Sequence, residues 1–301
     1  MANLIAEIGC EHGGSVDEFK RIADAVHAVP GVRFIKWQMY LTDSLVSRHH
    51  DPEHYKMLEA LEWSLNQHQE AKAHVDALPG VKPLVSVFSP DAVELAAALK
   101  FVNLKIGSGE LTDERTVRAA ARRVAATRGW LFVSTGMGTP KEIHRAGGWV
   151  AEEGNDAGTV WLACTSAYPC EEEAAHVRRV EWLMDHVASR DDLVGYSDHT
   201  KGALVAQMAV ALGAQWVEKH VTLGKGPDAN VALTPEQFED WAAQVQLAKD
   251  TLGSRTPRRL KCEIDTWRKA RKSRYMARRR DAGDVMDDDD FVWLRPNLEG
   301  R

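Results

Sequence analysis

Short apolar runs alternate with longer amphipathic segments along the 301 residues of the chain. The runs are rich in β-branched and aromatic residues, which is typical of strands buried on both faces of a parallel sheet. This pattern predicts eight strands, at residues 4–8, 33–37, 83–88, 102–106, 130–134, 159–164, 193–196 and 215–218.

The segments between these runs have the apolar spacing of helices that bury one face. Two such faces are Phe19, Ile22, Ala23 and Val26, and, at looser spacing, Phe238, Trp241, Val245 and Leu247. Helices are predicted to begin at Thr139-Pro140 and at Thr234-Pro235, because proline prefers the first position of a helix.

Alternating strands and helices over about 250 residues are typical of a TIM barrel. We therefore predict a (β/α)8 barrel over residues 1–255, followed by a linker and a short C-terminal arm over residues 256–301. A doubly wound open sheet is the alternative, but no G-x-G-x-x-G motif follows the first predicted strand.

Polar residues stand at the end of nearly every predicted strand. In a TIM barrel the C-terminal strand ends meet at one mouth, where active sites lie. A ring of polar side chains from separate strands therefore predicts a binding site there. Its members are Glu7, Lys36, Gln38, Ser86, Lys105, Ser108, Glu110, Ser134, Ser166, Ser197, His199, Glu218 and His220.

Two histidines in this ring point to a metal. His199, in the segment GYSDHTKG, and His220 end the last two strands, which are neighbours in a barrel. Two imidazoles so placed can share one divalent cation and leave positions open for water or substrate oxygens. Asp198 and Glu218 are then candidates to support the ligands, and a structural ion pair is the alternative for either.

The remaining polar residues suit an anion and proton transfer. Lys105 offers a positive charge, and Ser108, Ser134 and Ser197 offer hydroxyl donors, which together fit a phosphate or a carboxylate. Glu7 and Glu110 are candidate general acids or bases, because carboxylates in a crowded mouth can have shifted pKa values. A salt bridge with Lys36 is the alternative for Glu7.

Composition excludes several classes of protein. The chain is 44% apolar and 27% charged, its formal net charge is −6, and no apolar run is long enough to span a membrane. Four cysteines without CxxC spacing predict reduced thiols in a cytoplasmic protein. The first predicted strand begins at residue 4, so we expect no signal peptide.

One stretch departs from this average. Residues 268–280 are densely basic, and residues 287–290 are all aspartate. We expect a solvated segment whose two halves partly neutralise each other. The basic stretch contains a single aromatic residue, which is too little aromatic interleaving to indicate nucleic-acid binding. With the negative net charge, this argues against nucleic acid as a partner.

Seven stretches of the sequence resemble the sialic acid synthase family, which makes N-acetylneuraminate, legionaminate and pseudaminate. They occur in the family's order over about residues 4 to 240: AEIGCEHGGS, FIKWQ, KIGSGELT, VSTGMGT, CTSAYP, VGYSDHTKG and VEKHVTLGKGPDANVALTPEQF. The resemblance implies a phosphoenolpyruvate-dependent enzyme in which C3 of phosphoenolpyruvate joins the metal-polarised aldehyde of an open-chain sugar. Water then attacks C2, and phosphate leaves.

The resemblance also implies roles for individual residues. His199 and His220 would bind manganese, with magnesium or cobalt as alternatives. Phosphoenolpyruvate would be held by Lys105, Ser108, Ser134 and Ser197, and Ser166 stands where the family has Asn or Ser. The rest of the pocket would be lined by Glu7, Lys36, Gln38, Glu110, Tyr168 and Asp228.

Two other functions stay open from the sequence. One is a metal-dependent aldolase, or another 3-deoxy-sugar-acid synthase that uses a phosphorylated sugar. The other is a non-catalytic barrel that binds phosphoenolpyruvate and metal without turnover.

The chain departs from the family pattern inside the barrel. Glu11 replaces the family's usual Asn, and SVFSPD replaces STP, so that Ser86 takes the place of the threonine. The loop between His220 and Gly226 is shorter than usual, which affects the sugar side of the pocket.

The C-terminal region departs further. It resembles only the start of the family's antifreeze-like domain, with Arg295 at the place of an arginine that recognises the sugar. The resemblance implies a homodimer in which this region reaches the partner's barrel. We expect the acidic mouth of a neighbouring barrel to relieve the charge of residues 268–280. Because the lid is incomplete, we also expect an acceptor other than N-acetylmannosamine.

Overall fold

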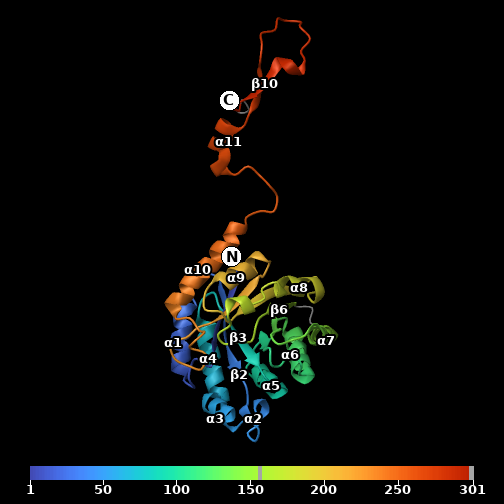
Figure 1. The fold of residues 1–301 in the computed structure, drawn as a ribbon. Coiled ribbons are helices and arrows are strands. Elements are labelled where there is room, and N and C mark those ends of the chain that lie inside the picture. Colours follow the sequence, from blue (N-terminus) through green and yellow to red (C-terminus); the bar gives the residue numbers. More distant parts are fainter. Residues whose placement is uncertain (155–157, 298–301) are drawn as a thin grey trace. The chain divides into compact units, whose positions relative to one another are not determined.

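Eight parallel strands close into a barrel, because β1 pairs with β8 as well as with β2 (Figure 1). The strands are β1 (Asn3–Gly9), β2 (Val32–Met39), β3 (Lys82–Val87), β4 (Leu104–Ile106), β5 (Leu131–Ser134), β6 (Thr159–Ala163), β7 (Leu193–Asp198) and β8 (Trp216–His220). The predicted TIM barrel is confirmed, and each predicted strand is found with its ends within two residues of the prediction.

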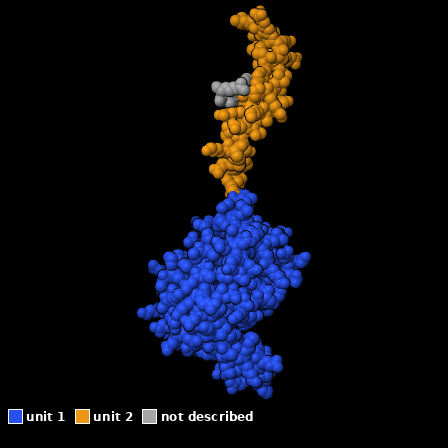
Figure 2. Space-filling view, turned by 90° about the vertical axis from the view of Figure 1, so that its left-hand side faces the viewer, with its two compact units in different colours: residues 1–252 blue, residues 253–301 orange. Residues whose placement is uncertain are grey.

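This computed structural model describes residues 1–154 and 158–297. The contacts divide the chain into two units, residues 1–252 and residues 253–301 (Figure 2). The barrel and its helices make up the first unit. Among the residues that the structure describes in the two units, no helix is both long enough and apolar enough to cross a membrane.

Helices surround the barrel in the first unit (Figure 1). They are α1 (Val16–Val26), α2 (Thr42–Leu45), α3 (Pro52–Leu61), α4 (Leu65–Ala77), α5 (Pro90–Ala98), α6 (Glu114–Thr127), α7 (Pro140–Glu152), α8 (Arg179–His186), α9 (Leu204–Ala211) and α10 (Pro235–Leu252), with a 3-10 turn η1 at Glu172–Ala174. The predicted helix starts are confirmed. Thr139 caps α7 in a reciprocal pair with Glu142, and α10 begins at Pro235.

The two predicted helix faces differ in outcome. Phe19, Ile22, Ala23 and Val26 of α1 are all buried, as are Phe238, Trp241 and Val245 of α10. Leu247, which was expected on the same face of α10, is 63% exposed. It follows Phe238 by nine positions, which is half a turn away from the buried face at 3.6 residues per turn.

Alternation along the strands places the polar residues inside the barrel. An apolar layer fills the interior and consists of Ile5, Phe34, Leu84, Phe132, Val160, Leu162 and Trp216. Two residues further along their strands, Glu7, Lys36, Ser86, Ser134 and Glu218 therefore point to the same side. The apolar layer closes one end of the barrel, and the polar layer above it faces the C-terminal mouth.

The second unit is small. It holds the 3-10 turn η2 (Lys261–Glu263), α11 (Ile264–Ala270), β9 (Ser273–Met276), the 3-10 turn η3 (Asp288–Asp290) and β10 (Phe291–Leu294), with β9 and β10 antiparallel. The basic and acidic stretches pair with each other here. Arg278 contacts Asp287 and Asp290, and Arg280 contacts Asp290. The expected mutual neutralisation is therefore found within the unit, which reduces the self-repulsion that a partner would have to relieve.

Candidate active site

A cavity of about 420 Å³ opens at the C-terminal ends of the strands. Every site residue predicted within the barrel lines it: Glu7, Lys36, Gln38, Ser86, Lys105, Ser108, Glu110, Ser134, Ser166, Tyr168, Ser197, His199, His220 and Asp228. Arg295 belongs to the C-terminal unit, where it directly follows β10. Sequence reasoning did not select Phe88 and Met137, which also line the cavity.

Four buried charges lie at the base of this cavity. Lys36 pairs with Glu7, and its Nζ also lies 3.5 Å from Oε2 of Glu218. Lys105 pairs with the other oxygen of Glu218. The salt bridge that was the alternative for Glu7 is therefore present. Glu218, assigned from the sequence only a supporting role, joins both lysines.

Burial and pairing shift the two carboxyl groups in opposite directions. Burial raises the pKa of Glu7 to about 7, although Lys36 opposes the shift. Burial would also raise the pKa of Glu218, but Lys105 and Lys36 outweigh it and hold that pKa well below its usual range. Glu218 is thus a permanent anion between two lysines, whereas Glu7 can exchange a proton near neutral pH.

Hydroxyl groups surround the lysines. Ser197 donates to Oε1 of Glu218 at 2.8 Å, and Ser86 accepts from Nζ of Lys36 at 3.1 Å. No described residue is a hydrogen-bond partner for the buried Oγ of Ser134 or of Ser166. Buried hydroxyls normally have partners. These two are therefore available to a ligand with several acceptor oxygens.

A glycine gives such a ligand room beside the hydroxyls. A Cβ atom built on Gly136 would lie only 2.3 Å from Oγ of Ser166 and 2.7 Å from Oγ of Ser108. The backbone N–H of Gly136 also donates to Oγ of Ser108 at 3.1 Å. The loop after β5 thus brings its backbone close to the serines without a side chain in the way.

The two histidines approach each other at the ends of β7 and β8, and their ring centroids are 5.5 Å apart. Nδ1 of His199 lies 2.9 Å from the carbonyl oxygen of Thr165, so the proton sits on Nδ1 and Nε2 carries the free lone pair. Nδ1 of His220 is buried without a hydrogen-bond partner among the described residues. Burial lowers the pKa of both imidazoles, so both are neutral at physiological pH.

Two neutral imidazoles with free lone pairs are suitable ligands for a divalent ion. The described residues contain no group of three or more His, Cys, Asp or Glu side chains that could hold a metal. A cation here would therefore take its other ligands from water or substrate, as the sequence predicted. The donor set fits a metal that binds with open positions.

Tyr168 and Asp228 flank the histidines. The Tyr168 ring lies 4.3 Å from the His199 ring, and burial raises the pKa of its phenol, which stays protonated and can donate. Oδ2 of Asp228 lies 3.7 Å from Nδ1 of His220. Both side chains come from loops, after β6 and β8, so their positions depend on how those loops are held.

Asp198 is not beside either imidazole. It alternates with Ser197 and His199 along the chain, so it points to the helix side of the sheet and pairs with Lys219 at 3.0 Å. Both side chains of this pair are fully buried. Lys219 also donates to the carbonyl oxygen of Thr200, and Asp198 accepts from the Thr200 N–H and hydroxyl. Any effect of Asp198 on the orientation of His199 therefore acts through the backbone. Lys219 was not among the residues predicted for the site.

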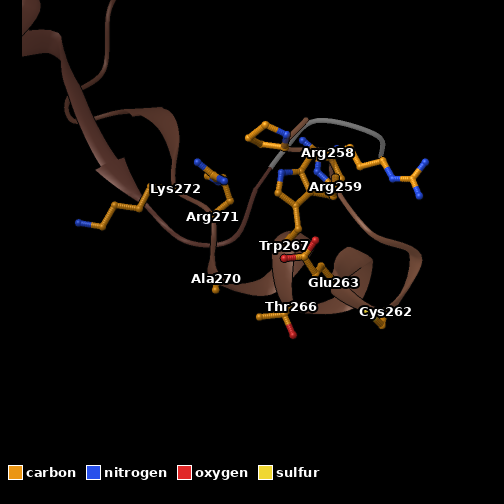
Figure 3. Close-up of a pocket in the computed structure, with 10 residues that line it drawn as sticks. Arg258, Arg259, Cys262, Glu263, Thr266, Trp267, Ala270, Arg271 and Lys272 are labelled. Atoms are coloured by element: carbon orange, nitrogen blue, oxygen red, sulfur yellow. The ribbon is translucent and has the colours of Figure 1, made fainter. Parts of the chain in front are cut away.

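The C-terminal unit contains a larger cavity of about 870 Å³, lined by residues between Pro257 and Lys272 (Figure 3). Arg259 stacks at 3.6 Å over the Trp267 ring, and Arg258 and Glu263 lie nearby (Figure 3). Every lining side chain is exposed or half-buried. This cavity therefore lacks the desolvated polar groups that distinguish the barrel mouth.

The closed barrel and the charged cavity at its strand ends define a (β/α)8-barrel enzyme. The chain belongs to the NeuB family, whose model matches residues 22–257. It is a synthase of the sialic acid type, that is, a phosphoenolpyruvate-dependent transferase that forms a carbon–carbon bond. Enzymes of this family generally depend on a metal.

Known proteins resemble the chain over almost its whole length. The N,N'-diacetyllegionaminic acid synthase of Legionella pneumophila is 30% identical over 311 residues, which cover 97% of this chain and 85% of that protein. An uncharacterised protein of Methanocaldococcus jannaschii is 30% identical over 296 residues, which cover 97% of this chain and 84% of that protein. The crystal structure of a putative spore coat polysaccharide biosynthesis protein E from Chromobacterium violaceum superposes with a TM-score of 0.83 at 24% identity, covering 100% of this chain and 90% of that one.

Proposed function

We propose that this enzyme condenses phosphoenolpyruvate with the open-chain aldehyde of an acylated amino sugar other than N-acetylmannosamine. A bond forms between C3 of phosphoenolpyruvate and the aldehyde carbon, water adds to C2, and the bond from C2 to the phosphate oxygen breaks. The products are a 3-deoxy-2-keto acid and inorganic phosphate. The observation that carries the proposal is the juxtaposition of buried lysines and free hydroxyls with two neutral imidazoles in one cavity.

Phosphoenolpyruvate is assigned to the lysine side of the cavity. Lys105 and Lys36 supply charge, and the hydroxyls of Ser108, Ser134, Ser166 and Ser197 supply donors for phosphate and carboxylate oxygens. Ser86 orients Lys36, and Glu218 holds Lys105 and Ser197. Binding then replaces water around a dianionic group by donors that are already in place.

The acceptor is assigned to the histidine side. Gln38, Tyr168 and Asp228 line the cavity there and can bind hydroxyl groups of a sugar. His199 and His220 would hold the divalent ion, for which we propose Mn²⁺. Imidazole ligands disfavour Mg²⁺, which prefers oxygen, whereas Co²⁺ stays an alternative because nitrogen ligands bind it more tightly than Mn²⁺. When bound, the ion supplies Lewis-acid polarisation of the aldehyde.

The buried ion pair of Asp198 and Lys219 lies behind the two histidines and offers a test of what fixes the distance between the imidazoles. In the double variant Asp198→Asn/Lys219→Met both charges are gone, so no buried ion is left uncompensated and folding is expected to be close to normal. The Thr200 carbonyl oxygen loses its Lys219 donor, so the loop that carries His199 is held less firmly. We expect Mn²⁺ binding, measured by isothermal titration calorimetry, to weaken about tenfold. Unchanged affinity would show that the pair serves only the fold.

Glu110 is assigned, beside Glu7, as a group that exchanges a proton. Burial raises its pKa to about 7, above the ordinary value of 4.5. The folded state thus holds more protons than the unfolded state between pH 4.5 and 7, so stability falls as pH rises through this window. Above pH 7 the buried side chain is ionised, so the full free-energy cost of burying the carboxylate lowers the stability of the folded state.

Glu110→Gln removes this cost, because glutamine does not ionise. We expect the variant to be more stable than the wild type by about 1–2 kcal/mol at pH 8, after allowance for the partial exposure of the side chain, and equally stable at pH 4. Turnover should fall about 100-fold. Urea unfolding at both pH values checks the first result. Equal stability at pH 8 contradicts the raised pKa.

The remaining assignments concern the assembly. We infer a cytoplasmic homodimer in which residues 256–301 form an arm and Arg295 contacts the acceptor. The resemblance to the sialic acid synthases supports this inference. Sedimentation at micromolar concentration tests the dimer, and a monomer would refute it.

The first experiment measures phosphate release from phosphoenolpyruvate with a panel of aldehydes, including N-acetylmannosamine and phosphorylated sugars, with and without a chelator. Release that needs metal and an acylated amino sugar other than N-acetylmannosamine supports the proposal. Efficient turnover of N-acetylmannosamine would refute the altered acceptor. Turnover only with phosphorylated sugars points to another 3-deoxy-sugar-acid synthase. Carbon–carbon bond formation without phosphate release points to an aldolase. Binding of phosphoenolpyruvate with no release identifies a non-catalytic barrel.

A further inference from the structure

Glu11 connects two segments that are 217 residues apart in the sequence. It follows β1, its side chain is 2% exposed, and its Oε1 accepts a hydrogen bond of 2.7 Å from the backbone N–H of Asp228. Asp228 lies in the loop between β8 and α10. Glu11 does not line the cavity itself, so its contact with this loop is its route to the site.

The loop lies directly against the Glu11 carboxylate. Gly226 has a φ of +114°, and a Cβ atom built on it would lie 2.2 Å from Oε2 of Glu11. Only glycine combines this backbone conformation with so close an approach. Asp228 also begins a turn of the backbone within this loop. Its carbonyl oxygen accepts hydrogen bonds from the N–H groups of Val231 and Ala232, each at 2.9 Å.

The same loop forms the acceptor side of the cavity. The carboxylate of Asp228 lines the cavity beside His220, and Asn230 donates to the carbonyl oxygen of Tyr168 at 3.3 Å. The loop is closed at its base by hydrogen bonds between Val221 and Glu7 and between Leu233 and His220. Its base is therefore held by the barrel. The segment around Asp228 is held by the Asn230 side chain and by Glu11, which binds the backbone N–H of Asp228 itself.

We propose that Glu11 is a positioning residue that sets the place of Asp228 and thereby governs binding of the acceptor, not of phosphoenolpyruvate. This inference rests on the proposed function, which assigns the acceptor to this side. A charged acceptor of hydrogen bonds suits the role, because bonds from a backbone N–H to a carboxylate are about twice as strong as neutral ones. Burial raises the pKa of Glu11 to about 7, so holding the loop this way carries a cost at neutral pH.

Two variants separate the contact from the bulk of the side chain. Glu11→Gln keeps the size and an oxygen that accepts from the Asp228 N–H, whereas Glu11→Leu keeps the size and removes the acceptor. The matched control is Glu62→Leu, because Oε2 of Glu62 accepts from the Thr42 N–H at 2.8 Å in the same way, away from the cavity. Thermal melting confirms that each variant is folded.

Hydrogen exchange of the backbone amides gives a readout that needs no substrate. In Glu11→Leu we expect exchange over residues 221–234 to be about tenfold faster or more, with the barrel strands unchanged. In Glu11→Gln and in Glu62→Leu the loop should exchange within about threefold of the wild type. Unchanged exchange of this loop in Glu11→Leu overturns the proposal, whatever the activity.

Kinetics then tests the link to the acceptor. With the aldehyde that the panel identifies, KM for the aldehyde should rise about tenfold in Glu11→Leu, while KM for phosphoenolpyruvate stays the same. Equal increases in both constants overturn the assignment to the acceptor. If no aldehyde is turned over by the wild type, the proposed function fails and the acceptor role with it, while the exchange data still decide whether Glu11 holds the loop.

Discussion

Replacement of His199 or His220 by alanine is expected to remove most of the bound divalent ion and to lower turnover about a thousandfold. The described residues contain no group of three or more His, Cys, Asp or Glu that could hold a metal. The two imidazoles are the protein ligands that we propose, so the loss of either would leave a single weak contact. Metal content after dialysis, measured by inductively coupled plasma mass spectrometry, and phosphate release check the two parts. The barrel should stay folded, because both side chains point into the cavity.

A buried histidine outside the cavity is the control for this experiment. His68 accepts a hydrogen bond of 3.1 Å from Trp37 Nε1, and burial lowers its pKa to about 4. Its replacement by glutamine, which keeps an acceptor, should leave metal content unchanged. Full metal and full turnover in either His199→Ala or His220→Ala would falsify the metal assignment.

Replacement of Glu218 by glutamine is expected to lower the free energy of unfolding by about 3–5 kcal/mol at pH 7. Glutamine has nearly the same volume but no charge, so Lys105 loses its partner and Lys36 keeps only Glu7. The pKa of Glu218 is lowered in the folded state, so its stabilisation is present above its ordinary pKa and is lost as pH falls. The difference between the variant and the wild type should therefore shrink below pH 4.

Phosphoenolpyruvate should partly restore the stability of this variant, because its negative charge can take the place of the missing carboxylate between the lysines. We expect the increase in Tm on saturation with phosphoenolpyruvate to be larger for Glu218→Gln than for the wild type. Glu7→Gln is the matched control. Its carboxyl has a pKa of about 7 and Lys36 still faces Glu218, so the loss of stability should be smaller. Equal losses in the two variants would contradict the central place of Glu218.

The barrel itself was predictable because its signals are local. Each strand is a short apolar run that polar residues terminate, and each helix shows its own periodicity or cap. Leu247 shows the limit of this reasoning. It lies nine positions after Phe238, so a strict spacing of 3.6 residues per turn places it opposite the buried face, where it is exposed; the looser spacing that was assumed hides this difference.

The members of the site were predictable for a related reason. Strand ends of a TIM barrel converge, so polar residues at those ends must share one mouth, as Lys36, Ser134 and His220 do. Their partners were not predictable in the same way. Alternation along a strand tells which side a residue faces, but not which side chains from other strands it will meet there.

By itself, the sequence determined the closed succession of strands and helices and the kinds of group that face the barrel mouth. Only the tertiary structure decided that Glu218 joins two lysines, that Asp198 pairs with Lys219 behind the sheet, and that Glu11 holds the Asp228 loop. These contacts depend on the register of the closed barrel and on the path of one loop. The physical reason is that long-range pairing is set by where the backbone brings groups together, whereas the pattern along the chain reports only what each residue prefers locally.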